Sequence, residues 1–90
     1  MKTKQEKAVE ANRLLDEAWD NMDERHCGTA VPKAESAIAI YQSLAIDDPT
    51  TFDPMLADAY NTLSMAYAFM HRPDEAEDTA AKALFFAGKT

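Results

Sequence analysis

The stretch from Ala57 to Gly88 constrains the fold most, because it carries two apolar patterns of helical spacing with a short break between them. Residues three and four positions apart lie on the same face of a helix. The first pattern forms a stripe of Leu56, Ala59, Tyr60, Leu63, Ala66, Tyr67 and Met70. The second forms a stripe of Ala76, Ala80, Ala83, Leu84 and Ala87. The stretch therefore predicts two helices that pack on each other through these stripes.

The break at 71–75 carries the signals of a helix start. Pro73 suits the first helical position, where no backbone N–H donor is needed. Asp74 and Glu75 then place negative charge at the positive end of the helix dipole. Gly88 follows the last apolar position, where a left-handed C-cap suits glycine. These residues predict a helix that begins at Pro73 and ends before Gly88.

The spacing of these residues resembles a tetratricopeptide repeat, whose pattern is W-x2-L-G-x2-Y, then A-x3-F, then P. The corresponding residues are Tyr60, Leu63, Ser64 and Tyr67, then Ala76, Ala80 and Ala83, with Gly88 where the family usually carries proline. The small side chains of Ala76 and Ala83 let the second helix approach the first closely. The resemblance implies an all-α fold of two stacked αα-hairpins in a right-handed superhelical array. A generic αα-hairpin is the alternative.

The N-terminal half, 1–49, reads as an earlier, degenerate repeat ahead of the well-matched one at 53–88. A helix is predicted from about Lys4 to Glu24. Its apolar stripe comprises Ala8, Ala11, Leu15, Ala18 and Met22, and is widened by Leu14 and Trp19. Such a stripe is typical of a helix that packs on a globular core. Trp19 is therefore expected to pack between this helix and the next as a large contributor to stability.

A long loop is predicted at 23–31, where Gly28 interrupts the pattern, followed by a helix from Pro32 to about Ile46. Asp53 and Pro54 provide an N-cap and a first-turn proline for the third helix. Equivalent positions of the two units lie further apart than the family period of about 34 residues, which places extra residues in the loops. The whole chain, 1–90, is expected to form one domain of four antiparallel helices.

The charge balance narrows the classes of partner. The formal net charge is −7, with 9 Lys and Arg against 16 Asp and Glu. Binding to nucleic acid needs clustered Lys and Arg, so no nucleic-acid partner is expected, and no anionic membrane surface either. The segment 1–7 is not followed by the apolar run of a secretory signal. No stretch has the roughly 18 apolar residues of a membrane span, and a cytoplasmic location is expected.

The sequence gives no support for catalysis. Cys27 is the only cysteine, so no internal disulfide can form. His26 and Cys27 are adjacent but lack the second ligand pair of a zinc site, and a solvated loop is the alternative. The serines have no glycine-rich elbow, and no glycine loop suited to phosphate is present. We expect no enzymatic activity, no metal and no cofactor.

A protein-binding surface remains, and the resemblance implies where it lies. In the family, the first helix of each pair lines a concave groove that receives an extended peptide or a partner helix. In this chain the corresponding residues are Glu10, Arg13, Glu17 and Asp20, with Asp58, Asn61, Met65 and Phe69. The groove would be acidic with an apolar spot, which suits a basic and apolar peptide. The expected function is that of an adaptor or small chaperone-like module. Alternatively, Met65 and Phe69 simply pack against the first helix.

Phe85 and Phe86 suggest a second surface. They are consecutive, so one buried stripe cannot easily take both, and both are expected to point away from the stripe of the last helix. Repeat arrays generally need capping elements to cover their ends. We therefore predict a homodimer joined through Phe85 and Phe86. The corresponding alternative function is a self-associating assembly subunit without a peptide ligand.

Overall fold

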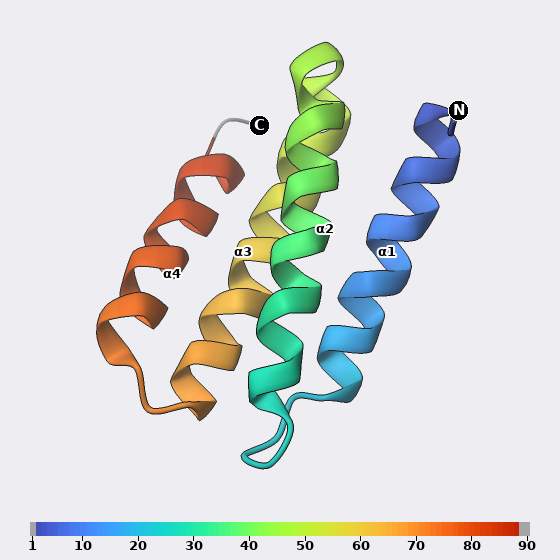
Figure 1. Cartoon of the computed structure of the whole chain (residues 1–90). Coiled ribbons are helices and arrows are strands. Elements are labelled where there is room, and N and C mark those ends of the chain that lie inside the picture. The colour runs from blue at the N-terminus through green and yellow to red at the C-terminus, as the bar shows by residue number, and fades with distance from the viewer. Residues whose placement is uncertain (1, 89–90) are drawn as a thin grey trace.

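The protein is all-α, and its computed structural model describes residues 2–88. The helices are α1 (Lys4–Asp20), α2 (Cys27–Asp47), α3 (Pro49–Phe69) and α4 (Pro73–Ala87). Each helix packs antiparallel on the next one along the chain, and α1 also touches α3 (Figure 1). The predicted fold class is confirmed: α1 with α2, and α3 with α4, form two αα-hairpins that stack through α2 and α3.

The core follows the predicted stripe closely on α3, whereas on α4 Ala83 is the one stripe member that is buried and Ala87 is exposed. On α3, the buried members of the stripe are Leu56, Ala59, Tyr60, Leu63 and Ala66. Opposite them lie fully buried alanines, which are Ala11 and Ala18 on α1 and Ala30, Ala34 and Ala37 on α2. Alanine at these positions lets neighbouring helix backbones approach closely, while the tyrosines and leucines fill the remaining space.

Trp19 and Leu84 lie outside this core, contrary to the prediction. Trp19 is 46% exposed and Leu84 is 75% exposed. Each of them follows a buried alanine, Ala18 or Ala83. One residue of a helix corresponds to a rotation of about 100°, which carries both large side chains to the edge of the buried face.

The end of α1 and the start of α2 differ from the prediction. Helix α1 ends at Asp20 rather than Glu24, and the side chain of Asn21 donates to the Glu17 carbonyl at 3.0 Å. Helix α2 begins at Cys27 rather than Pro32, and it includes Gly28. Pro32 therefore lies in the second turn, where it forgoes one backbone hydrogen bond.

Helix α3 likewise begins before its predicted start. Asp48 is its N-cap and accepts from the Thr51 N–H at 3.3 Å, and Pro49 occupies the first helical position. Asp53, the predicted N-cap, is instead buried within the helix, and Pro54 lies in the second turn. The predictions for α2 and α3 failed in the same way, because a proline was taken to mark the first turn.

The turn between α3 and α4 contains a left-handed residue, His71 (φ 60°). The N–H of Arg72 donates to the Tyr67 carbonyl at 2.9 Å, and the N–H of His71 donates to the Ala68 carbonyl at 3.1 Å. This pair of bonds is the Schellman motif that ends a helix. Helix α4 then begins at Pro73 as predicted. Gly88 is right-handed (φ −73°), so the predicted left-handed C-cap is wrong.

No helix within residues 2–88 combines the length and apolar character needed to cross a bilayer.

Candidate functional site

Residues of α2, α3 and α4 line a groove whose walls are α2 and α4 and whose floor is α3. Figure 1 shows α3 between these two helices. The volume of the groove is about 580 Å³, which lies within the range of protein ligand sites. The floor is apolar and aromatic, made by Tyr60, Leu63 and Tyr67, and Ile38 of α2 adds an apolar side chain beside it. The walls carry four carboxylates, which are Glu35 on α2 and Asp74, Glu75 and Asp78 on α4. Lys82 supplies the one positive charge among the groove-lining residues.

Tyr60 is held in place by contacts from both walls. Gln42 on α2 donates from Nε2 to the Tyr60 hydroxyl oxygen at 3.0 Å. On α4, the ring of Phe86 stacks on the Tyr60 ring with centroids 5.6 Å apart, and Lys82 Nζ lies 5.9 Å from the ring centroid. A lysine over a tyrosine face is attracted by the ring quadrupole. These contacts fix one level of the groove across all three helices.

Tyr67 lies between the acidic walls. Burial raises the pKa of Tyr67, and the carboxylates of Glu35 and Glu75 raise it further. Those two residues belong to opposite walls, α2 and α4, so the negative charge of both walls acts on the same part of the floor. A cation that entered this part of the groove would meet carboxylates on two sides.

The wall carboxylates differ in how far they are neutralised. Glu75 pairs with Arg72 at 3.4 Å, and Asp78 pairs with Lys82 at 3.5 Å. Glu35 and Asp74 form no ion pair with any residue between 2 and 88. Exposed ion pairs are weak, so even the paired carboxylates remain open to a competing cation.

Three of the predicted groove residues on α1, Glu10, Arg13 and Glu17, form ion pairs with α2 or with their own end of the chain. Glu17 accepts from Lys33 of α2 at 2.6 Å and from Arg13 at 2.5 Å, and these bonds lower its pKa. Glu10 accepts from Lys2 at 2.5 Å, which lowers its pKa as well. Asp20 is exposed at the last position of α1. The acidic face expected on this helix is thus partly neutralised by neighbouring lysine and arginine side chains.

Tyr41 of α2 interacts with residues of both α1 and α3. The buried hydroxyl of Tyr41, on α2, donates to Asn12 Oδ1. Burial raises the pKa of Tyr41, and the carboxylates of Asp16 on α1 and Asp58 on α3 raise it further. Asp58, which was predicted to share a groove with Glu10 and Glu17, thus acts on Tyr41 together with Asp16 of α1.

The remaining predicted residues on α3 have mixed surroundings. Asn61 and Met65 are exposed. Phe69 is half-buried and lines a small pocket with Glu24 and His71, so the α1–α2 loop covers part of it.

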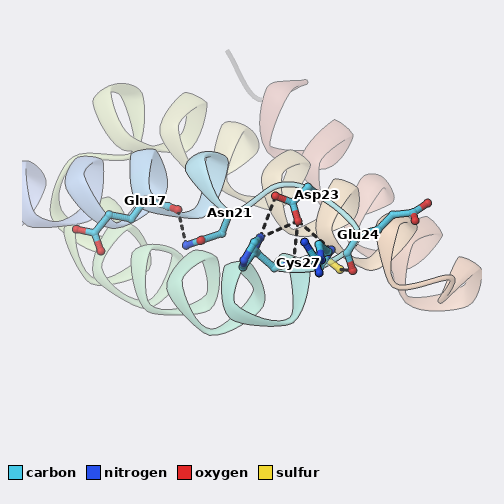
Figure 2. Close-up of polar contacts among 7 residues, drawn as sticks. Glu17, Asn21, Asp23, Glu24 and Cys27 are labelled. Carbon is cyan, nitrogen blue, oxygen red and sulfur yellow. Dashed lines mark hydrogen bonds and ion pairs between the residues drawn. The ribbon is translucent and has the colours of Figure 1, made fainter.

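Hydrogen bonds of Asp23 and Cys27 hold the segment that joins α1 to α2 (Figure 2). Asp23 Oδ1 accepts from the N–H groups of Arg25 and His26, both at 2.8 Å, and lies 2.9 Å from His26 Nδ1. The His26 contact is the main cause that lowers the pKa of Asp23. Cys27 is buried and its Sγ donates to the Glu24 carbonyl at 3.7 Å. Over the described part of the chain, no group of three or more His, Cys, Asp or Glu is arranged to hold a metal.

The two phenylalanines of α4 have different environments. Phe86 is half-buried on Tyr60, so it does not point away from the packed face as predicted. Phe85 is 62% exposed and meets the edge of Phe86 with centroids 5.2 Å apart. The difference arises because Phe86 lies four residues after Lys82, on the flank that covers Tyr60.

Comparison of the chain with protein-family models, with curated proteins and with solved structures finds no match. The resemblance carried by Tyr60, Leu63 and Tyr67 therefore stays an interpretation of the residues themselves.

The groove between α2 and α4 was not predicted from the sequence. One signal for it was present, because Asp74 and Asp78 lie four residues apart on one helix face. Its opposite wall, with Glu35, depends on how α2 is placed across α3.

Proposed function

We propose that the protein is an interaction module that binds a basic and apolar segment of another protein in the groove between α2 and α4. The observation that carries this proposal is the pairing of an aromatic floor with carboxylates on both walls. Apolar side chains of a partner would gain free energy from burial on Tyr60, Leu63 and Tyr67. Its lysines or arginines would meet Glu35 and Asp74, which have no internal ion pair within the described residues.

The family resemblance supports the same class of function by analogy. Two stacked αα-hairpins are what a pair of tetratricopeptide repeats would form, and that family acts through protein recognition. Fold-level analogy names a mode of action and not a site. The proposed surface therefore rests on the groove contacts and differs from the α1–α3 face that the family pattern implies. On this basis we propose an adaptor role without catalysis.

Isothermal titration with peptide probes tests this function. The probe is a 12-residue peptide of Lys, Arg, Leu and Phe, titrated into wild type and into two charge-matched variants. Glu35→Gln with Asp74→Asn removes two charges from the groove. Asp20→Asn with Asp58→Asn removes two charges from the α1–α3 side.

We expect the groove variant to bind about three- to tenfold more weakly and the control to bind like wild type, since each exposed ion pair contributes up to about 1 kcal/mol. Affinity should also fall as salt rises, because exposed charges are screened. Equal weakening in both variants, or loss only in the Asp20 and Asp58 variant, would contradict the groove as the binding surface.

Self-association is a second candidate, favoured by the exposure of Leu84 and Phe85 beside each other on α4. A symmetric dimer would bury the same patch twice. Sedimentation equilibrium at tens of micromolar should show a dimer for wild type and a monomer for Leu84→Glu with Phe85→Glu. Phe86 is left unchanged in this variant because it packs on Tyr60. A monomeric wild type, or a variant that stays dimeric, would reject this function.

A further inference from the structure

The groove is not uniform along its length, because its contacts fall on two levels. At the first level, Tyr60 contacts Gln42 on one wall and Lys82 on the other. At the second level, Tyr67 lines the groove together with Glu35 on one wall and Glu75 on the other. Each second-level residue is seven positions from its first-level counterpart on the same helix. Seven residues are two helical turns, or about 10 Å.

The direction of the helices makes these levels coincide. Helices α2 and α4 run the same way and α3 runs opposite to them, since consecutive helices are antiparallel. Moving back along α2 and α4 therefore corresponds to moving forward along α3. Glu35, Tyr67 and Glu75 consequently form one level, near the end of the groove where α4 begins.

Beyond the first level, both walls carry exposed or half-buried apolar side chains. Phe86 covers Tyr60, and Phe85 packs edge-on against Phe86 while remaining 62% exposed. On the opposite wall, Ile46 lies one turn beyond Gln42 on the same flank and is 83% exposed. Carboxylates thus gather at one end of the groove, and large apolar side chains lie next to its lining residues at the other end.

We infer that the groove selects the orientation of its occupant: it binds an amphipathic helix of a partner protein whose cationic end lies at Tyr67 and whose apolar end lies at Tyr60 and Ile46. This inference rests on the proposed function and adds to it the polarity of the bound segment. A helix suits the site, because recognition of an amphipathic helix uses an apolar groove with anchors one and two turns apart. Charge complementarity at the Glu35 level then fixes which end is which.

Two designed peptides distinguish oriented from unoriented binding. The first is an 18-residue amphipathic helix with Leu and Phe in one half and Lys and Arg in the other. The second has the same composition with the charged and apolar residues distributed evenly. We expect the segregated peptide to bind at least about fivefold more tightly, because only it can satisfy both ends of the groove at once.

A nitroxide label on either end of the segregated peptide reports the orientation directly. With the label at the cationic end, amide signals around Glu35, Tyr67 and Glu75 should broaden while those around Ile46 stay sharp. With the label at the apolar end, the pattern should reverse. Equal broadening of both regions by each label would overturn the inference, yet binding in the groove would still support the proposed function.

A double-mutant cycle measures how much the charge of Glu35 contributes to binding of the cationic end of the peptide. Glu35→Gln should weaken the segregated peptide about two- to fivefold, the range of one exposed ion pair. The same substitution should leave unchanged the affinity of a peptide that carries Gln in place of its Lys and Arg. Ile46→Ser should weaken both peptides equally. If Glu35→Gln weakened both peptides alike, charge would not fix the orientation. If neither peptide bound in the groove, the proposed function itself would fail.

Discussion

At the scale of single residues, Trp19 should contribute less to the stability of the fold than the smaller Leu56, because Trp19 is exposed. Trp19 is 46% exposed, whereas Leu56 is 2% exposed and lies in the core between helices. A buried leucine replaced by alanine typically costs about 2–5 kcal/mol, because a cavity remains where the side chain was. An exposed ring leaves no such cavity.

We therefore expect Trp19→Ala to lower the free energy of unfolding by less than about 2 kcal/mol, and Leu56→Ala to lower it by about 2–5 kcal/mol. Urea denaturation of both variants, with unfolding followed by circular dichroism, provides the comparison. A Trp19→Ala variant that is destabilised as much as Leu56→Ala would show that α1 buries a different face.

Because of Asp23, the free energy of unfolding should depend on pH in the acid range. Its hydrogen bond to the His26 side chain, together with the N–H groups of His26 and Arg25, lowers the pKa of Asp23 below the ordinary value of an aspartate. A carboxyl whose pKa is lower in the folded state stabilises that state fully above the unfolded pKa. This contribution is lost as pH falls through the lowered, folded pKa.

Wild type should consequently exceed Asp23→Asn in stability by a constant amount above about pH 5 and lose that advantage below about pH 4, near the ordinary aspartate pKa. Urea denaturation of both proteins from pH 7 down to pH 2.5 measures this difference. Asp20→Asn serves as a control for the loss of one exposed carboxylate. An advantage that stayed constant down to pH 2.5 would show that Asp23 does not act through its charge.

At the scale of the helices, the end of α3 carries a residue poorly suited to its conformation. His71 adopts φ 60° in the Schellman motif, where a Cβ atom is disfavoured and glycine is the usual residue. His71→Gly should therefore raise the free energy of unfolding by about 0.5–1 kcal/mol. His71→Ala, which removes the imidazole but keeps the Cβ atom, should bring no such gain. If alanine and glycine were equally stabilising at this position, the imidazole and not the backbone would be the source of strain.

The helix starts also show where sequence reasoning succeeds locally and where it fails. The start of α4 at Pro73 was predicted correctly. There the proline is followed directly by two acidic residues, which favour the first turn of a helix. Pro32 and Pro54 each lie five residues after the first residue of their helix. The N-cap of α3 is Asp48, whose carboxylate accepts the Thr51 N–H, and the N-cap of α2 is His26, which makes no side-chain capping hydrogen bond. A proline in the second turn is tolerated at the loss of one hydrogen bond, so proline alone does not fix a helix start.

At the scale of the whole molecule, helical periodicity was sufficient to predict four antiparallel helices and most of the buried face of α3. Periodicity reports how side chains are distributed around one helix. It does not report which other helices border that face. Glu35 and Asp74 share a groove only because α2 and α4 lie on either side of α3. For the same reason, Glu17 was assigned to a groove with Asp58 although it pairs with Lys33 of α2.

The measurement that tests the groove most directly is a titration of the 15N-labelled protein with the segregated amphipathic peptide, followed by amide chemical shifts. We expect the largest changes along the two walls and the floor, at Glu35, Gln42, Tyr60, Tyr67 and Asp78, and small changes at Glu10, Glu17 and Asn61. Shifts concentrated at Asp58, Asn61 and Met65, with the α2–α4 groove unaffected, would contradict the groove and would favour the face between α1 and α3.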